Sequence, residues 1–142
     1  MHVDSFQWKQ IALRVTAKEH VLFFFYLQVD MQEMKSVTAI VTMGGIGSTS
    51  NQWIMSYTLS YSASGNDEFI SVTDDNGTMQ VFDGNANNDN ATHHDFATPI
   101  VARKVRLHPK SWYNGVTLRW GLIGCSYGKL KLSVPQPHMS AI

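Results

Sequence analysis

The sequence predicts an all-β protein of the sandwich or barrel type. From Tyr26 onward apolar and polar residues alternate with a period of two, which is the spacing of a half-buried strand. The alternating runs are short, and clusters of Gly, Asn, Asp and Ser separate them. The chain has 142 residues, of which 44% are hydrophobic, so we expect one domain with one core.

The first twenty residues give no clear element. Trp8, Ile11, Ala12 and Val15 lie near helical spacing, but no capping residue or turn frames them. We therefore assign no secondary structure to this segment.

Residues 36–43 and 53–62 are the first two well-marked strands. In both runs every second residue is apolar, and Ser or Thr occupies many of the positions between. The alternation is clearest in the second run, where Tyr57, Leu59 and Tyr61 share one face. One buried and one solvated face are expected for such a strand.

Residues 68–72 and 78–82 are expected to form a hairpin. The connection 74–77 ends in Asn76-Gly77, a pair that readily adopts the positive φ angles of a tight turn. Both runs are shorter than the preceding strands.

Residues 101–108 and 116–124 are expected to be the last two strands. Every second residue of the latter run is apolar up to Leu122. After Cys125 the sequence has Pro135 and Pro137 and little periodicity, which is typical of a tail or linker.

Composition excludes several classes of protein. Lys and Arg together number 11, as do Asp and Glu, so no net positive field attracts nucleic acid, and nucleic acid is not an expected partner. The longest apolar run, residues 21–27, is far shorter than the ~20 residues that span a bilayer. No stretch has the pattern of a secretion signal. The single Cys125 can form neither an intrachain disulfide nor a zinc site of several cysteines.

Two N-glycosylation sequons are present. They are Asn76-Gly77-Thr78 and Asn90-Ala91-Thr92, each in a turn-like setting of Asn, Asp and Gly. They predict glycosylation at Asn76 and Asn90, and chance occurrence in an Asn-rich and Thr-rich chain is the alternative.

Seven sequence blocks follow in a fixed order and end in Gly124-Cys125. The blocks are Tyr26-Leu27-Gln28-Val29-Asp30, VTAIVTMG at 37–44, SYTLSYS at 56–62, Phe82-Asp83-Gly84-Asn85, PIVARKVRLHP at 99–109, Trp112, and LRWGLIGC at 118–125. In this order they resemble the coagulation factor V/VIII type C domain, also called the discoidin domain. The resemblance covers residues 26–125.

The resemblance implies a distorted jelly-roll β-sandwich of about eight strands. It also implies an extracellular binding module rather than an enzyme, for cell adhesion or surface recognition. Loops at one end would contact membrane phospholipid headgroups or cell-surface glycans, and a matrix or receptor protein is a further expected partner. The alternatives are a carbohydrate-binding module of a larger carbohydrate-active enzyme, and a structural spacer that has lost its ligand loops.

The chain also departs from the family pattern. Family members have a longer segment before the Leu-Gln-Val-Asp strand, with a first Cys that pairs with the closing one. We therefore expect residues 1–25 to be a divergent or mispredicted segment, and the first strand or two of the sandwich to be missing. We also expect residues 126–142 to be a tail or linker, and Cys125 to be a disulfide half without its partner. Gly121 stands where the family has Glu, so Arg119 is expected to lack its carboxylate partner.

The strongest candidate for ligand binding is the segment that corresponds by position to the family's third loop. Its residues are Gly44, Gly45, Ile46, Gly47, Ser48, Thr49, Ser50, Asn51, Gln52 and Trp53. Its glycines predict a mobile hairpin tip. In a lipid interpretation Ile46, together with Met43, enters the acyl boundary. In a glycan interpretation Trp53 stacks on the sugar while Asn51 and Gln52 donate and accept hydrogen bonds. An ordinary connection with Trp53 in the core is the alternative.

The sequence contains one cluster of basic residues. It consists of Arg103, Lys104, Arg106, Lys110 and Arg119. Strand alternation puts Lys104, Arg106 and His108 on one face, which is a candidate patch for phosphate or sulfate groups. The resemblance instead favours structural roles for Arg103, Arg106 and Arg119, and a core position for Trp112.

Metal and catalytic sites are not expected. Residues 83–89 carry oxygen ligands at alternate positions, as a calcium loop does, but Asn88 and His94 stand where the EF-hand template has Gly and Glu. We read this segment as a polar turn, with calcium as the less favoured alternative, and expect no cofactor. The adjacent side chains of His93-His94-Asp95 diverge, and no common hydrolase or nucleotide-binding motif is present.

Overall fold

The computed structural model describes residues 2–3, 9–11, 26–46, 50–64, 68–127 and 138–141. These residues form strands and connections and no helix, so the all-β prediction is confirmed. Accordingly, the described residues include no helix that could span a membrane.

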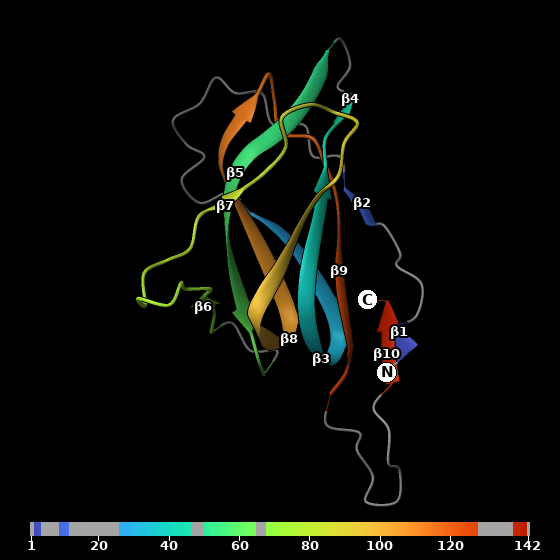
Figure 1. Ribbon diagram of the computed structural model, residues 1–142, viewed down its shortest axis with the longest axis vertical. Helices are drawn as coiled ribbons and strands as arrows, with labels where there is room; N and C mark the ends of the chain where they lie inside the picture. The colour runs from blue at the N-terminus through green and yellow to red at the C-terminus, as the bar shows by residue number, and fades with distance from the viewer. Residues whose placement is uncertain are drawn as a thin grey trace, which may run out of the picture.

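The strands pair in the order β1-β10-β9-β3-β8-β5-β4 (Figure 1). In chain order they are β1 (His2–Val3), β2 (Lys9–Ile11), β3 (Leu27–Met43), β4 (Gly45–Ile46), β5 (Asn51–Ser62), β6 (Ile70–Ser71), β7 (Phe82–Asp83), β8 (Thr92–Tyr113), β9 (Leu118–Ser126) and β10 (His138–Ala141). Outside this path β2 pairs with β9, and β6 and β7 both pair with β5.

β3 and β8 each belong to both layers of a sandwich. The first part of β3 pairs with the second half of β8, where Leu27 lies opposite Leu107, and that half of β8 also pairs with β5. The second part of β3 pairs with the start of β8 and, along its other edge, with β9. The β3–β8 register shifts between Asp30 and Lys35, where Gln32 has a φ of 66°. Strands that pass between layers through such an irregularity make the corner of a sandwich.

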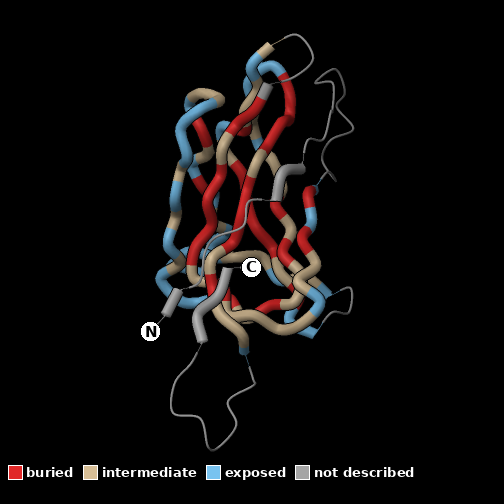
Figure 2. The backbone as a smooth tube through the Cα atoms, turned by 90° about the vertical axis from the view of Figure 1, so that its right-hand side faces the viewer, coloured by how far each residue is buried: buried red, intermediate tan, exposed pale blue. Residues whose placement is uncertain are grey.

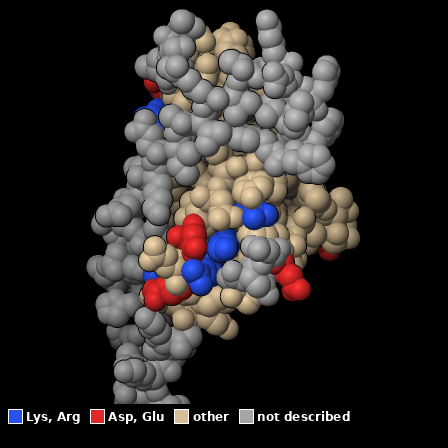
Figure 3. Space-filling view, turned by 180° about the vertical axis from the view of Figure 1, so that it is seen from behind, with Lys and Arg blue, Asp and Glu red and all other residues tan. Residues whose placement is uncertain are grey.

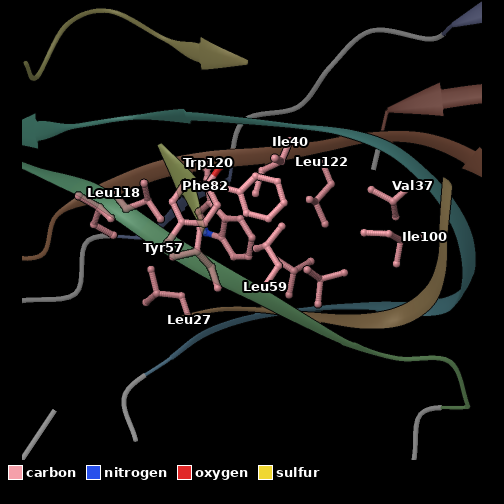
Figure 4. Close-up of a cluster of buried hydrophobic side chains, with 14 of the residues drawn as sticks. Leu27, Val37, Ile40, Tyr57, Leu59, Phe82, Ile100, Leu118, Trp120 and Leu122 are labelled. Atoms are coloured by element: carbon pink, nitrogen blue, oxygen red, sulfur yellow. The ribbon is translucent and has the colours of Figure 1, made fainter. Parts of the chain in front are cut away.

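The core fills the space between the two layers (Figure 4). Ile40 of β3, Tyr57 and Leu59 of β5, and Trp120 of β9 are each at most 1% exposed. Tyr57 stacks on Phe82 of β7 with ring centroids 5.4 Å apart. Figure 2 shows the buried residues along the interior strands. Each large apolar side chain buried here contributes about 1.5 to 3 kcal/mol to folding.

The two longest strands exceed their predicted lengths. The run predicted at 36–43 is the second part of the 17-residue β3, and the run at 101–108 is the middle of the 22-residue β8. Alternation marked only the parts that face the core. In residues 92–99 of β8 no side chain is fully buried, and Phe96, which packs partly buried against the core, is an isolated large apolar residue, so these residues lack the alternation of a strand.

The predicted hairpin at 68–82 is present but differs in its strands. The Asp74 carboxylate accepts hydrogen bonds from the backbone N–H groups of Asn76 and Thr78, which shapes the turn. Thr73 and Met79 form an isolated bridge. The two strands of this segment, β6 and β7, however, both pair with β5 and not with each other.

Strands also occur in the two terminal segments. β2 and β10 both pair with β9 along the edge that β3 leaves open, and β1 pairs in parallel with β10 (Figure 1). β10 lies in the segment that the sequence predicts to be a tail. Strands of two to four residues are too short for period-two alternation to reveal them.

Candidate ligand-binding end of the sandwich

Three chain segments meet at one end of the sandwich, the upper end in Figure 1. We call them together the loop end, which comprises residues 44–53, 84–91 and 113–119. Gly45 and Ile46 of β4 pair with Gln52 and Asn51 of β5, so a hairpin forms as predicted. The tip residues Gly47, Ser48 and Thr49, and the side chain of Ile46, lie outside the described residues.

Close packing, and not freedom of the backbone, explains the first two glycines of the hairpin. A Cβ on Gly44 would lie 2.7 Å from the Cβ of Trp53 and 2.9 Å from the Cα of Asn88. A Cβ on Gly45 would lie 2.5 Å from the Cγ2 of Thr117. The base of the hairpin therefore packs tightly against the other two segments. The sequence predicted the glycines to make the hairpin mobile and did not predict this packing.

Arg119 connects two of the three segments. Its Nε donates to the carbonyl oxygen of Gly44 at 2.8 Å, and its second terminal amino group donates to the carbonyl oxygen of Asn88 at 3.0 Å. The Asn88 amide in turn donates to Oδ1 of Asn51 at 3.2 Å. Arg119 was expected to lack a carboxylate partner because position 121 is Gly. Two backbone carbonyl groups accept its hydrogen bonds instead, and the sequence did not predict them.

Asn85 fixes the second segment from inside. Its side chain is buried, and its amide nitrogen lies 3.0 Å from the carbonyl oxygens of Thr42 and Asn90 and 3.1 Å from Oγ1 of Thr92. Oδ1 of Asn87 accepts hydrogen bonds from the backbone N–H groups of Asp89 and Asn90. The Asn side chains of this calcium-like segment thus bind its own backbone and neighbouring segments. No cluster of three His, Cys, Asp or Glu residues suited to a metal occurs in the part of the chain that the structure describes.

An aromatic pair lies on the outer side of the loop end. The rings of Trp53 and Tyr113 are stacked, with centroids 4.2 Å apart and planes 12° apart. Trp53 is half-buried and Tyr113 is 46% exposed, so Tyr113 presents the more open ring. The sequence predicted Trp53 as a site residue but not Tyr113. Strand alternation could have identified Tyr113 as an outward-facing residue, because it follows Trp112, which packs against the core.

The basic residues of β8 lie away from the loop end, among acidic neighbours. Nε of Arg103 donates to Oδ1 of Asp30 at 3.1 Å, and this hydrogen bond is the main reason why the pKa of Asp30 lies below its ordinary value. Lys104 and Arg106 alternate with the buried Val105, so they share an outer face. Figure 3 shows basic and acidic atoms side by side on the back of the molecule.

Arg106 lies between two aromatic rings. Its Cζ is 4.0 Å from the ring centroid of Tyr26 and 3.6 Å from that of Phe69, and its Nε donates to Oε1 of Gln28 at 2.9 Å. The next outward residue, His108, has its Nε2 2.8 Å from Oγ of Ser60. Burial, and to a smaller extent the charge of Arg106, lowers the pKa of His108.

The remaining candidates do not join a common site. Nε2 of His93 lies 2.8 Å from Oδ1 of Asp95, whereas Nε2 of His94 lies 2.6 Å from the carbonyl oxygen of Asp83, so the two imidazoles diverge as expected. Asn76 and Asn90 are exposed. Cys125 is a half-buried free thiol on β9.

Comparison with known proteins identifies the family. The F5/8 type C domain model matches residues 5–122. The chain is 39% identical to lactadherin of Rattus norvegicus over 100 residues and 36% identical to coagulation factor V of Bos taurus over 105 residues. Each match covers 70% of this chain, but only 23% and 4% of the respective relative.

A solved structure supports the same assignment. Discoidin II of Dictyostelium discoideum matches with a TM-score of 0.62 and 26% identity, over 75% of this chain and 40% of that one. The predicted jelly-roll sandwich is therefore confirmed. The chain belongs to the F5/8 type C, or discoidin, domain family of binding modules.

Proposed function

We propose that this chain is an extracellular recognition module for cell adhesion or surface recognition, and that its loop end contacts cell-surface glycans or phospholipid headgroups. The observation that carries the proposal is the fixed loop end itself. Arg119 ties the hairpin to the loop at 84–91, and Trp53 and Tyr113 stack beside them. A binding surface that is ordered before the ligand arrives loses less entropy on binding.

A neutral glycan fits the chemistry of the loop end best. Tyr113 offers a partly exposed ring against which the C–H face of a sugar can pack. Asn51 and Asn114, which are exposed and belong to the first and third segments of the loop end, offer amide groups for hydrogen bonds to hydroxyl groups. Arg119 is the only Lys or Arg in the loop end, and it already donates to two carbonyl groups. The loop end therefore provides little attraction for an anionic headgroup.

A phospholipid ligand remains the second candidate because of Ile46. This residue pairs with the exposed Asn51 immediately before the hairpin tip. Insertion of one such side chain into the acyl boundary would contribute about 1.5 to 3 kcal/mol.

The test is a binding panel on the folded protein. Immobilised galactose and fucose are compared with vesicles of phosphatidylserine and of phosphatidylcholine, using wild type, Tyr113→Ala and Ile46→Asp. Saturable sugar binding that Tyr113→Ala abolishes supports the glycan arm, and vesicle binding that Ile46→Asp abolishes supports the lipid arm. Absence of binding in every assay contradicts the proposal and favours the structural spacer.

Extracellular location is part of the same proposal. The relatives include coagulation factor V and a venom prothrombin activator subunit, which are named for blood clotting and for venom. Occupied glycans at Asn76 and Asn90 after expression through a secretory pathway would support this location.

A further inference from the structure

The surroundings of Arg106 are not explained by a ligand at the loop end. Arg106 lies in the middle of β8, opposite Gln28 of β3 and Ser60 of β5. Its neighbours Val105 and Leu107 are buried, so its side chain projects from the outer face of this layer. We call Tyr26, Gln28, Phe69, Lys104 and Arg106 the outer-face cluster.

The cluster holds the guanidinium group in one orientation. β8 lies between β3 and β5, and the ring of Tyr26 approaches Cζ from the β3 side while that of Phe69 approaches from the β5 side. Gln28 accepts the Nε–H hydrogen bond. Among the described residues, neither terminal amino group of Arg106 has a hydrogen-bond acceptor. These two groups are the edge of the fork that normally binds an oxyanion through two parallel hydrogen bonds.

A second positive charge lies on the same face. Lys104 lies two residues from Arg106 on the same face of β8. Asp30, which lies opposite Lys104 in β3, is hydrogen-bonded to Arg103 and is also near the charge of Lys104, so an anion must be held chiefly by the fork of Arg106. The rings on both faces of the guanidinium displace water from it, and this strengthens its interaction with an anion in the plane of the group.

We propose that Arg106 and Lys104 form an oxyanion site on the outer face of the sandwich, which takes a sulfate or phosphate group of a sulfated glycan or a phospholipid headgroup. The planar fork of Arg106 makes the two directed hydrogen bonds, and Lys104 adds a second positive charge. The site is separate from the loop end and does not depend on a ligand there.

Titration of the folded protein with sodium sulfate tests the site, with sodium chloride at matched ionic strength as the reference. We expect saturable NMR shifts at the Nε–H of Arg106 and at the ring of His108 only with sulfate. Arg106→Lys keeps the charge but lacks the fork, and should weaken sulfate binding at least tenfold. Lys104→Gln should weaken it about two- to fivefold, the effect of one exposed ion pair. Lys110→Gln, on the same strand outside the cluster, should bind sulfate as wild type does.

Several results would overturn the site. One is an equal response to chloride, and another is unchanged sulfate affinity in both Arg106→Lys and Lys104→Gln. If Arg106→Lys does not fold, Lys104→Gln and the position of the NMR shifts decide. Tyr113→Ala must leave sulfate binding unchanged, so failure at the loop end is distinguishable from failure here.

Two further arms identify the source of the oxyanion. Sulfated galactose is compared with galactose, and phosphatidylglycerol vesicles with phosphatidylcholine vesicles. Preference for the sulfated sugar assigns a glycan, and preference for phosphatidylglycerol assigns a headgroup. If Lys104→Gln weakens neither interaction, or if neither preference is seen, the proposed ligand class is wrong.

Discussion

Nε of Arg119 and the carbonyl oxygen of Gly44 are 2.8 Å apart, although the two residues are 75 positions apart in the chain. The Gly44 backbone is buried, and the same guanidinium also binds the carbonyl oxygen of Asn88. One charged side chain therefore satisfies two carbonyl groups and joins the first and second segments of the loop end.

Arg119→Met should destabilise the fold and loosen the loop end. It leaves the buried Gly44 carbonyl without a donor, and loss of a hydrogen bond to a charged group costs about 1.5 to 3 kcal/mol. Urea denaturation measures the change. The matched control is Arg103→Met, whose ion pair with Asp30 is partly exposed and should therefore contribute much less to stability. Equal losses in the two variants would mean that Arg119 has no special role.

Gly45→Ala should be destabilising by about 1 to 3 kcal/mol because its Cβ would overlap Cγ2 of Thr117. Thr117→Ser removes that methyl group and keeps the hydroxyl that donates to Oε1 of Gln52 at 2.6 Å. The double variant should therefore recover most of the stability lost by Gly45→Ala. A double-mutant cycle by thermal unfolding gives the coupling, and strictly additive losses would contradict the proposed overlap.

Tyr57→Phe should leave stability unchanged or raise it by up to about 1 kcal/mol. The hydroxyl of Tyr57 is buried and makes no hydrogen bond of good geometry among the described residues, although the side chain of Thr42 lies close to it. Burial raises the pKa of this group, and the nearby Thr42 lowers it to a smaller extent. The variant keeps the ring stacked on Phe82 and removes only the buried hydroxyl. Tyr57→Leu, which loses the stacking, is the contrasting control. A clear loss of stability in Tyr57→Phe would show that the hydroxyl is hydrogen-bonded in solution.

The ion pair of Asp30 should make stability depend on pH in the acid range. The Arg103 guanidinium holds the pKa of Asp30 below its ordinary value, so the folded state binds this proton less readily than the unfolded state. The stabilisation is therefore present above about pH 4 and is lost as the pH falls through the lowered pKa. Melting temperatures of wild type and Asp30→Asn should differ at pH 7 and converge at low pH. A difference that persists at the lowest pH would contradict this cause.

Sequence patterns predicted the elements with a regularly alternating apolar face and missed those without one. Tyr57, Leu59 and Tyr61 marked β5 because alternation reflects burial. The start of β8 escaped detection because it pairs with β3 through its backbone, and its one large apolar side chain that packs against the core, Phe96, has no apolar residue two positions before or after it. Residue type suggested Trp53 as an aromatic site residue, but only the strand register places Tyr113 opposite it.

The contacts of Arg119 could not be predicted for a different reason. Its acceptors are backbone carbonyl groups, which every residue carries, so no residue type identifies them in advance. The same is true of Gly44 and Gly45. Only glycine fits at these positions because other segments pack against them, and those segments cannot be identified from the sequence. Sequence reasoning located the hairpin of the loop end, while tertiary packing determines how it is held.

The corner strands also determine how this domain can fold. Because β3 and β8 supply backbone partners to both layers, neither layer has a complete set of strands without the other. Pairs such as Leu27 and Leu107 join distant parts of the chain, a topology whose folding takes milliseconds to seconds. We therefore expect one all-or-none transition, without a population in which half of the sandwich is formed. A proteolytic fragment that lacks either corner strand should retain neither layer, and it should therefore also lose the recognition surface.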